Sequence, residues 1–84
     1  MTLKLLYFAR LRERLGTIGE TLKLPDSAQD VAGLLKLLRK RGGNWESELT
    51  GRPVLVAVNQ NMVSPQHLLQ AGDEVALFPP VTGG

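Results

Sequence analysis

The sequence predicts an α+β fold in which one main helix covers one face of a mixed sheet of four to five strands. Three observations predict it. Residues 2–24 contain two segments of alternating side chains, the middle of the chain contains one amphipathic helix, and residues 54–78 contain further strand-like segments. Because a single helix can bury only one face of such a sheet, we expect the other face to stay open.

Composition narrows the classes of function. The chain has 84 residues, of which 43% are hydrophobic and 21% charged, as in a single ordinary globular domain. Cysteine is absent, which excludes disulfides, thiolate metal sites and a cysteine nucleophile. His67 is the only histidine, which argues against a histidine metal cluster and a Ser/His/Asp triad. Carboxylates, hydroxyls, lysines and the chain end remain for chemistry.

The N-terminal part of the chain predicts two antiparallel strands. Thr2–Phe8 alternates with apolar residues on both faces and is expected to form the first strand. Ala9–Gly16 is charged and predicts a short helical turn. Glu20–Leu24 alternates again and is expected to pair with the first strand.

The helix carries the clearest local signal. Ser27 is expected to be its N-cap, with Asp30 three residues later as a variant of the capping box. Gly42–Gly43 is expected to supply a left-handed cap at its end. The apolar stripe that should face the sheet consists of Val31, Leu34, Leu35 and Leu38.

The second half of the chain predicts the remaining strands. Asn44–Pro53 is expected to be a loop or short turn, and the β-branched segment Val54–Asn59 a buried central strand. Met62–Val63 predicts a short strand, Ser64–Gln70 a helical turn and Glu74–Phe78 the last strand. The order hairpin, helix, further strands, with the first strand crossed over to meet the last, is the β-grasp, or ubiquitin-like, arrangement.

The C-terminal residues form a distinct segment. We divide the chain into a β-grasp domain, residues 1–78, and a flexible carrier tail, residues 79–84. Pro79 and Pro80 end the last strand and stiffen the exit, because neither has an N–H for a ladder. The six tail residues can span ~20 Å, and Gly83 and Gly84 can enter a narrow channel. The alternative is an idle, frayed terminus, but the tail lacks the charges that would solvate one.

Three segments resemble one known family, the small subunit of molybdopterin synthase. The strongest is Gly72–Gly84, with its Pro-Pro-Val-Thr-Gly-Gly ending. Phe8–Glu13 resembles the end of the family's N-terminal strand, and Val56–Gln60 resembles its central strand and turn. Residues 42–53 carry no feature of the family.

The resemblance implies a sulfur carrier. In that family the terminal carboxylate, here that of Gly84, is adenylated with ATP by a partner resembling ubiquitin-activating enzymes and then becomes a thiocarboxylate. The tail enters the synthase large subunit, with which the carrier forms a heterotetramer. It delivers sulfur there to a cyclic pyranopterin precursor that becomes the molybdopterin dithiolene. The catalytic groups are expected on the large subunit, and we expect no metal and no tightly bound cofactor on this chain.

The side chains expected to bind partners lie at the two ends of the sequence. Phe8 and Phe78 share their strand parity with Leu6 and Ala76, so they should form an apolar patch on the open face; for Phe8 an ordinary core position is an equal alternative. Arg12 lies within the resembling segment and is expected to pair with a partner's carboxylate, although a solvated turn would also explain it. The predicted reactive residues are Gly83 and Gly84, and the predicted partner-binding residues are Phe8, Arg12, Phe78, Pro79, Pro80, Val81 and Thr82.

Three alternative functions stay open. A sulfur carrier for thiazole synthesis also ends in Gly-Gly but lacks the Phe-Pro-Pro-Val-Thr lead-in. A ubiquitin-like protein modifier would use the same activation, and a plain β-grasp binding module would not need the tail. The basic residues of 36–41 complement the helix dipole without accompanying aromatic residues, so no nucleic-acid partner is expected. Without a signal peptide or a membrane-spanning segment, the sequence predicts a cytoplasmic protein with no membrane partner.

Overall fold

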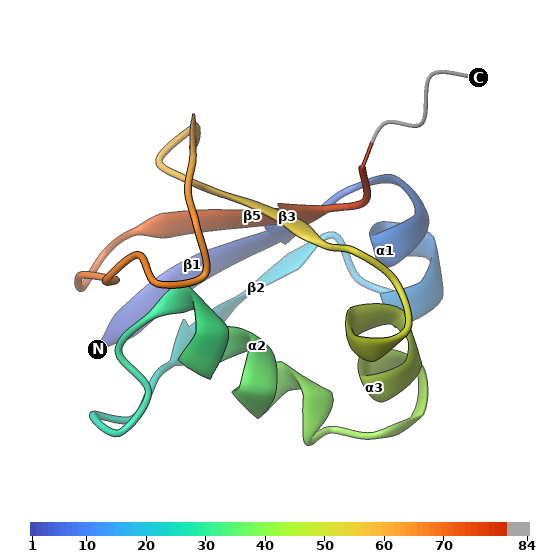
Figure 1. The fold of residues 1–84 in the computed structure, drawn as a ribbon, viewed down its shortest axis with the longest axis horizontal. Helices are drawn as coiled ribbons and strands as arrows, with labels where there is room; N and C mark the ends of the chain where they lie inside the picture. The colour runs from blue at the N-terminus through green and yellow to red at the C-terminus, as the bar shows by residue number, and fades with distance from the viewer. Residues whose placement is uncertain (81–84) are drawn as a thin grey trace.

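The structure, a computed structural model, describes residues 1–80 and contains one mixed sheet of five strands in the order β2-β1-β5-β3-β4 (Figure 1). The strands are β1 (Thr2–Tyr7), β2 (Gly19–Lys23), β3 (Leu55–Val58), β4 (Asn61–Met62) and β5 (Glu74–Phe78). The helices are α1 (Ala9–Leu15), α2 (Val31–Arg39) and α3 (Gly43–Thr50). The predicted α+β, β-grasp fold is confirmed, and each predicted strand lies within one residue of the observed bounds.

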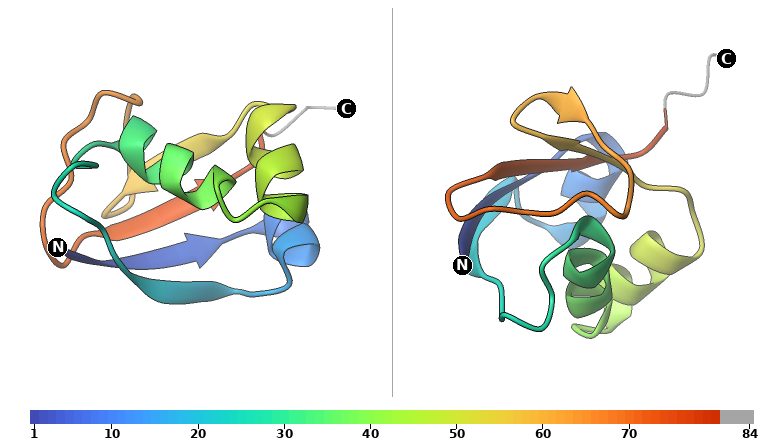
Figure 2. Two further views of the ribbon diagram at one scale, coloured as in Figure 1. Left: turned by 90° about the horizontal axis from the view of Figure 1, so that it is seen from below. Right: turned by 60° about the vertical axis from the view of Figure 1, so that its left-hand side comes forward.

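The first and last strands lie side by side at the centre of the sheet. β1 and β5 are parallel, with Leu5 opposite Val75 and Tyr7 opposite Leu77, whereas the other strand pairs are antiparallel. This crossover puts the end of β1 and the end of β5 at the same edge of the molecule. α2 and α3 pack beneath the sheet, and the two views of Figure 2 show that no helix of residues 1–80 covers its other face.

The core lies between the sheet and α2. The predicted apolar stripe of α2 is confirmed, because its four members are buried against the strands. Each fully buried leucine or valine contributes about 1.5–3 kcal/mol. The core residues contributed by the sheet are Leu3, Leu5, Tyr7, Val56, Val58, Val75 and Leu77.

The start of α2 differs from the prediction. Asp30, not Ser27, is the N-cap: its backbone is extended, and its Oδ1 accepts a hydrogen bond of 2.7 Å from the backbone N–H of Gly33. The preceding residues form a turn instead, in which the N–H of Ala28 donates to the carbonyl of Pro25, and the carbonyl of Gln29 accepts from the N–H of Leu69 outside the helix. The helix therefore begins three residues later than a Ser27 cap would place it.

The segment predicted as a helical turn, Ser64–Gln70, is an irregular loop instead. Its carbonyl groups serve α2, because Pro65 accepts from the N–H of Ala32 and His67 accepts from that of Val31. Leu68 forms an isolated bridge with Asp30. Carbonyl groups of the loop therefore accept hydrogen bonds from the first N–H groups of the helix, which have no acceptor within the helix itself.

The prediction of a loop or short turn at Asn44–Pro53 is also wrong, because most of it is α3. Trp45 and Leu49, four residues apart, both pack on the core. Gly42, with a φ of 75°, is the N-cap of α3, whereas α2 is capped by Lys40 in a right-handed conformation. The glycine pair therefore turns the chain between two helices rather than ending one.

Candidate protein-docking face and tail root

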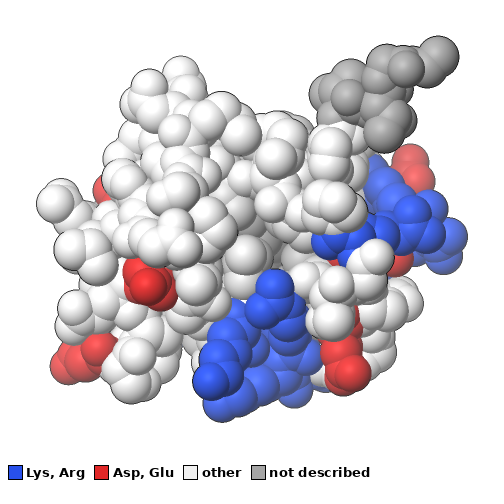
Figure 3. All heavy atoms as spheres, viewed as in Figure 1, with Lys and Arg blue, Asp and Glu red and all other residues white. Residues whose placement is uncertain are grey.

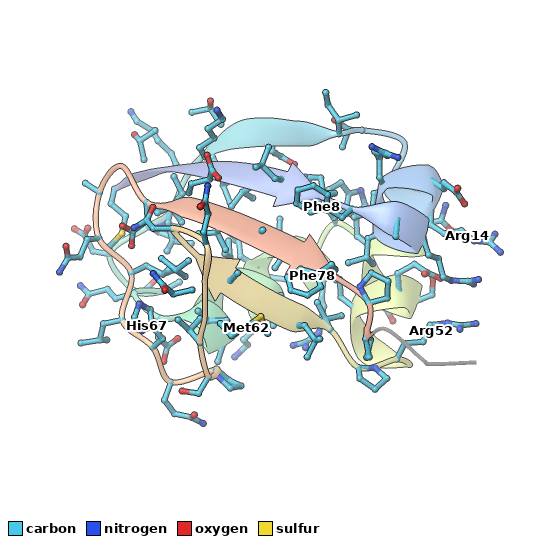
Figure 4. The ribbon with its side chains drawn as sticks, turned by 90° about the horizontal axis from the view of Figure 1, so that it is seen from above. Phe8, Arg14, Arg52, Met62, His67 and Phe78 are labelled. Atoms are coloured by element: carbon cyan, nitrogen blue, oxygen red, sulfur yellow. The ribbon has the colours of Figure 1, made fainter. Side chains whose placement is uncertain are left out.

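Apolar side chains gather on the face of the sheet that no helix covers. Phe8 is 44% exposed and Met62 58%, and Phe78 is half-buried. Figure 4 shows all three on this face. The strand register joins them, because Phe78 lies opposite Leu55 and Ala57 opposite Met62. We call this surface the open apolar face; its members are Leu6, Phe8, Leu55, Met62, Ala76 and Phe78.

Phe8 and Phe78 come together because β1 and β5 run in the same direction. The backbone N–H of Phe8 donates a 3.1 Å hydrogen bond to the carbonyl of Leu77, which continues the ladder by one residue beyond β1. Ala9 then takes a φ of 54°, a left-handed value that turns the chain sharply into α1. The turn leaves Phe8 on the open face, so the core alternative for Phe8 is wrong. Its role in docking stays a prediction.

The chain leaves the sheet beside this face. β5 ends at Phe78 because Pro79 and Pro80 have no N–H to continue the ladder, and both prolines are half-buried. They form one wall of a shallow hollow whose other lining residues are Arg10, Arg52 and Pro53. We call this hollow the tail-root notch. The remaining predicted tail residues, Val81, Thr82, Gly83 and Gly84, lie outside the described residues.

A buried carboxylate organises the charges around the notch. Glu48 of α3 has a side chain only 8% exposed, and its Oε1 accepts a 2.9 Å hydrogen bond from Nε of Arg10 in α1. This bond with Arg10 lowers the pKa of Glu48, and the charges of Arg52 and Arg14 lower it further. Arg12, in contrast, is exposed and forms no ion pair within residues 1–80, and its pairing with a partner's carboxylate stays a prediction.

Sequence reasoning missed two of these residues, Glu48 and Arg52. The helical spacing of Trp45 and Leu49 was a signal for the first, because it places Glu48 beside the apolar side of α3. Nothing in the sequence pairs Arg10 with Glu48, which lies 38 positions away. Arg52 has no local signal either, since only the fold brings it to the end of β5.

Away from the notch, one acidic side chain has a clear structural role. Asp73 shapes a turn, because its Oδ2 accepts from the N–H of Gln70 and its Oδ1 from the side chain of Asn59. His67 lies at the opposite end of the sheet from Arg14 and Arg52 (Figure 4).

Within residues 1–80, no three histidine or acidic side chains come close enough together to hold a metal ion. In the same part of the chain, no helix has the length and apolar character needed to cross a membrane.

Comparison with known proteins decides the family. The profile of the ThiS family matches residues 5–84. The chain belongs to the ThiS family. Within this family it is 40% identical, over 98% of its length and 99% of the relative's, to the molybdopterin synthase sulfur carrier subunit of Escherichia coli. It is 35% identical to the subunit of that name from Haemophilus influenzae, over 98% of the chain and 99% of that relative.

Solved structures superimpose on the full length of this chain. SAMP1 from Haloferax volcanii superimposes with a TM-score of 0.80 at 27% identity over 100% of both chains. Subunit 1 in a complex of subunits 1 and 2 of molybdopterin-converting factor from Helicobacter pylori has a TM-score of 0.69 at 24% identity, again over 100% of both chains, and shares the fold. The resemblance to the molybdopterin synthase small subunit, drawn from three short segments, is confirmed over the whole chain.

Proposed function

We propose that this chain is the sulfur carrier subunit of molybdopterin synthase. The observation that carries the proposal is the full-length identity with curated subunits of that name. The open apolar face supports it, because exposed apolar patches such as that of Phe8 and Met62 often mark protein-interaction sites. The chain also contains no cysteine, so a transferable sulfur atom must be held by another group.

The proposed group is the C-terminal carboxylate of Gly84. A carboxylate oxygen is a poor leaving group, so the carboxylate first attacks ATP, forms an acyl adenylate and releases pyrophosphate. A sulfide-level nucleophile then attacks the acyl carbon and displaces AMP, which leaves a thiocarboxylate. An adenylating partner of the ubiquitin-activating type would supply the ATP site. In this proposal the chain itself holds no tightly bound cofactor.

The large subunit of the synthase is the proposed recipient. It would bind the open apolar face and take residues 79–84 into its active site, where the thiocarboxylate sulfur attacks a carbon of the pyranopterin precursor, forms a carbon–sulfur bond and displaces an oxygen substituent from that carbon. Water then cleaves the acyl–sulfur bond, which returns Gly84 to a carboxylate and leaves the sulfur on the product. In this proposal the carrier works in the cytoplasm as part of a heterotetramer and contributes no catalytic side chain.

Activation can be tested directly by mass. Purified protein incubated with an activating enzyme, ATP and a sulfur source should gain the mass difference between sulfur and oxygen on its C-terminal peptide. A protein that forms only conjugates with lysine residues, with no such gain, would contradict the carrier function.

Tail variants provide the matched test. Replacing Gly84 by a bulky residue, or adding one residue after it, should abolish sulfur delivery, because the carboxylate would no longer reach the reacting groups. The thermal stability should stay that of the wild type, since the core lies within residues 1–78. Retained synthase activity in either variant would contradict the proposal, as would full function after deletion of Gly83 and Gly84, which a plain binding module predicts.

One observation favours a second candidate. Small archaeal modifier protein 1 from Haloferax volcanii superimposes on this chain with a TM-score of 0.69 at 28% identity, over 95% of this chain and 98% of the modifier. A protein modifier would form an isopeptide bond between Gly84 and a lysine side chain. Peptide mapping for such a linkage in the same activation assay separates the two functions. The thiazole-synthesis carrier is tested by whether a thiazole synthase, rather than the molybdopterin synthase large subunit, binds the chain.

A further inference from the structure

We propose that the tail-root notch binds a carboxylate side chain of the synthase large subunit, with Arg52 as its main cationic contact. This inference rests on the proposed function and adds to it a polar anchor beside the open apolar face. Arg52 is not among the partner-binding residues predicted from the sequence.

The charges around the notch do not balance within the described residues. Glu48 is the only carboxylate that pairs with an arginine there, and its partner is Arg10. Arg14 and Arg52 form no ion pair within residues 1–80, although both lie close enough to lower the pKa of Glu48. Figure 3 shows the resulting concentration of positive side chains at the end of the molecule where the described chain stops.

Arg10 is oriented for a second bond. Its Nε donates to Oε1 of Glu48 at 2.9 Å, and its Nη2 approaches Oε2 at 3.5 Å. Its Nη1 forms no hydrogen bond within the described residues, and the side chain is 37% exposed. The buried carboxylate therefore fixes the guanidinium while leaving part of it at the surface. A group that enters the notch would meet this edge of Arg10 together with the exposed Arg52.

The chemistry of the notch favours a carboxylate. Guanidinium groups present forked N–H donors that match the two oxygens of a carboxylate. The other walls are Pro53, Pro79 and Pro80. Proline has no N–H to offer an anion, and its ring excludes water from one side of the charge pair, which strengthens the attraction.

The position of the notch favours a protein partner and, among proteins, the large subunit. Pro53 lies two residues before Leu55, and Pro79 directly follows Phe78, so the notch lies at the end of the strand pair that carries these two members of the open apolar face. An apolar centre with a charged rim is the usual anatomy of a protein interface. A subunit that binds the face and takes up the tail must pass the notch, and an acidic side chain there would fix the angle at which the tail enters.

Two substitutions of Arg52 test the proposal. We expect R52A to weaken binding to the large subunit about tenfold, and R52E to weaken it further, because the new carboxylate would repel the partner's. Lys40 supplies the control, because it is exposed at the end of α2, on the helical side of the sheet. The variant K40E changes the net charge as much as R52E does and should bind as the wild type does. Titration calorimetry at low and at high salt measures the affinity of the wild type and of all three variants, and the salt dependence of binding should be weaker in R52A than in the wild type.

The outcomes separate this inference from the proposed function. If the wild type binds the large subunit and R52E binds as tightly as K40E, the notch proposal is wrong while the carrier function stands. If R52E loses affinity only for the adenylating partner, the assignment to the large subunit is wrong. If ATP or inorganic phosphate binds the isolated chain and R52E abolishes this, the notch is an anion site rather than a docking contact. A wild type with no affinity for the large subunit would overturn both proposals.

Discussion

Tyr7 donates a 2.7 Å hydrogen bond from its phenolic hydroxyl to Oε2 of Glu20, across the pair β1–β2. Arg41 binds both oxygens of the same carboxylate, at 2.7 and 2.8 Å, and its guanidinium lies 4.4 Å from the ring centre of Trp45. Trp45 in turn meets Tyr7 edge to face, with ring centres 5.4 Å apart. These four side chains join the sheet to the segment around α3. Burial, followed by the bond to Glu20, raises the pKa of Tyr7, and the bond to Arg41 lowers the pKa of Glu20.

Replacing Tyr7 by phenylalanine should reduce the free energy of unfolding by about 1–2 kcal/mol, because a hydrogen bond to a charged group is lost while the ring remains. For a domain of this size that corresponds to a fall in Tm of roughly 4–15 °C. Trp45 is the only tryptophan, so its fluorescence reports urea unfolding directly. The variants Y7F, E20Q and the double mutant form a cycle, and additive effects would show that the bond contributes nothing.

Acid should destabilise the protein through Glu20 and Glu48. The pKa of each is lowered, by bonds to Arg41 and Arg10 respectively. The unfolded chain therefore binds protons more readily, and the stability these groups provide is complete above the unfolded pKa of about 4.3 and lost as the pH falls through the lower, folded pKa. Urea unfolding between neutral pH and about pH 3 should show this loss. The curves of E20Q and E48Q should be flatter than the wild type's, and an unchanged slope in both would contradict the ion-pair assignments.

The sequence predicted the side-chain orientations that follow from the regular alternation of residues along a strand. Alternation along β1 and β5 was enough to place Phe8 and Phe78 on one face, because strand side chains point to opposite sides in turn. It could not place Arg52 or pair Arg10 with Glu48, because these contacts join residues brought together only by the packing of α1, α3 and β5. α3 itself was missed because Gly43, Asn44 and Ser47 have low helix propensity and tertiary packing of Trp45 and Leu49 overrides it.

Two glycines should respond in opposite ways to alanine. At Gly19 an added Cβ would collide with the backbone carbonyl oxygen of Leu5, because β2 passes close to β1 there. We expect Gly19→Ala to destabilise the fold by about 1–3 kcal/mol. At Gly51 the backbone is right-handed, and the new Cβ would meet only the carbonyl oxygen of Ser47 at 3.4 Å. Gly51→Ala should therefore be neutral or stabilise the protein by up to about 1 kcal/mol. Equal Tm values for the two variants would contradict the close approach of β1 and β2.

The open apolar face gives the most direct test of docking. Phe78 lies between Phe8 and the tail root, opposite Leu55. An aromatic residue at the centre of an interface contributes 2 kcal/mol or more, so Phe78→Ala should weaken binding to the large subunit by about 30-fold or more. Calorimetry with the purified large subunit measures this loss.

Leu68 provides the matched control for Phe78→Ala. It is 68% exposed and forms a bridge with Asp30 at the start of α2, and the neighbouring His67 lies at the opposite end of the sheet from Arg52 (Figure 4). Leu68→Ala also removes an exposed apolar side chain, but it should leave the affinity unchanged, because the proposed partner covers only the face beside the tail. Both variants should keep the wild-type circular dichroism spectrum, since neither side chain belongs to the core. Equal affinities for the two variants would mean that the large subunit does not bind this face. That conclusion would hold whether or not the tail transfers sulfur.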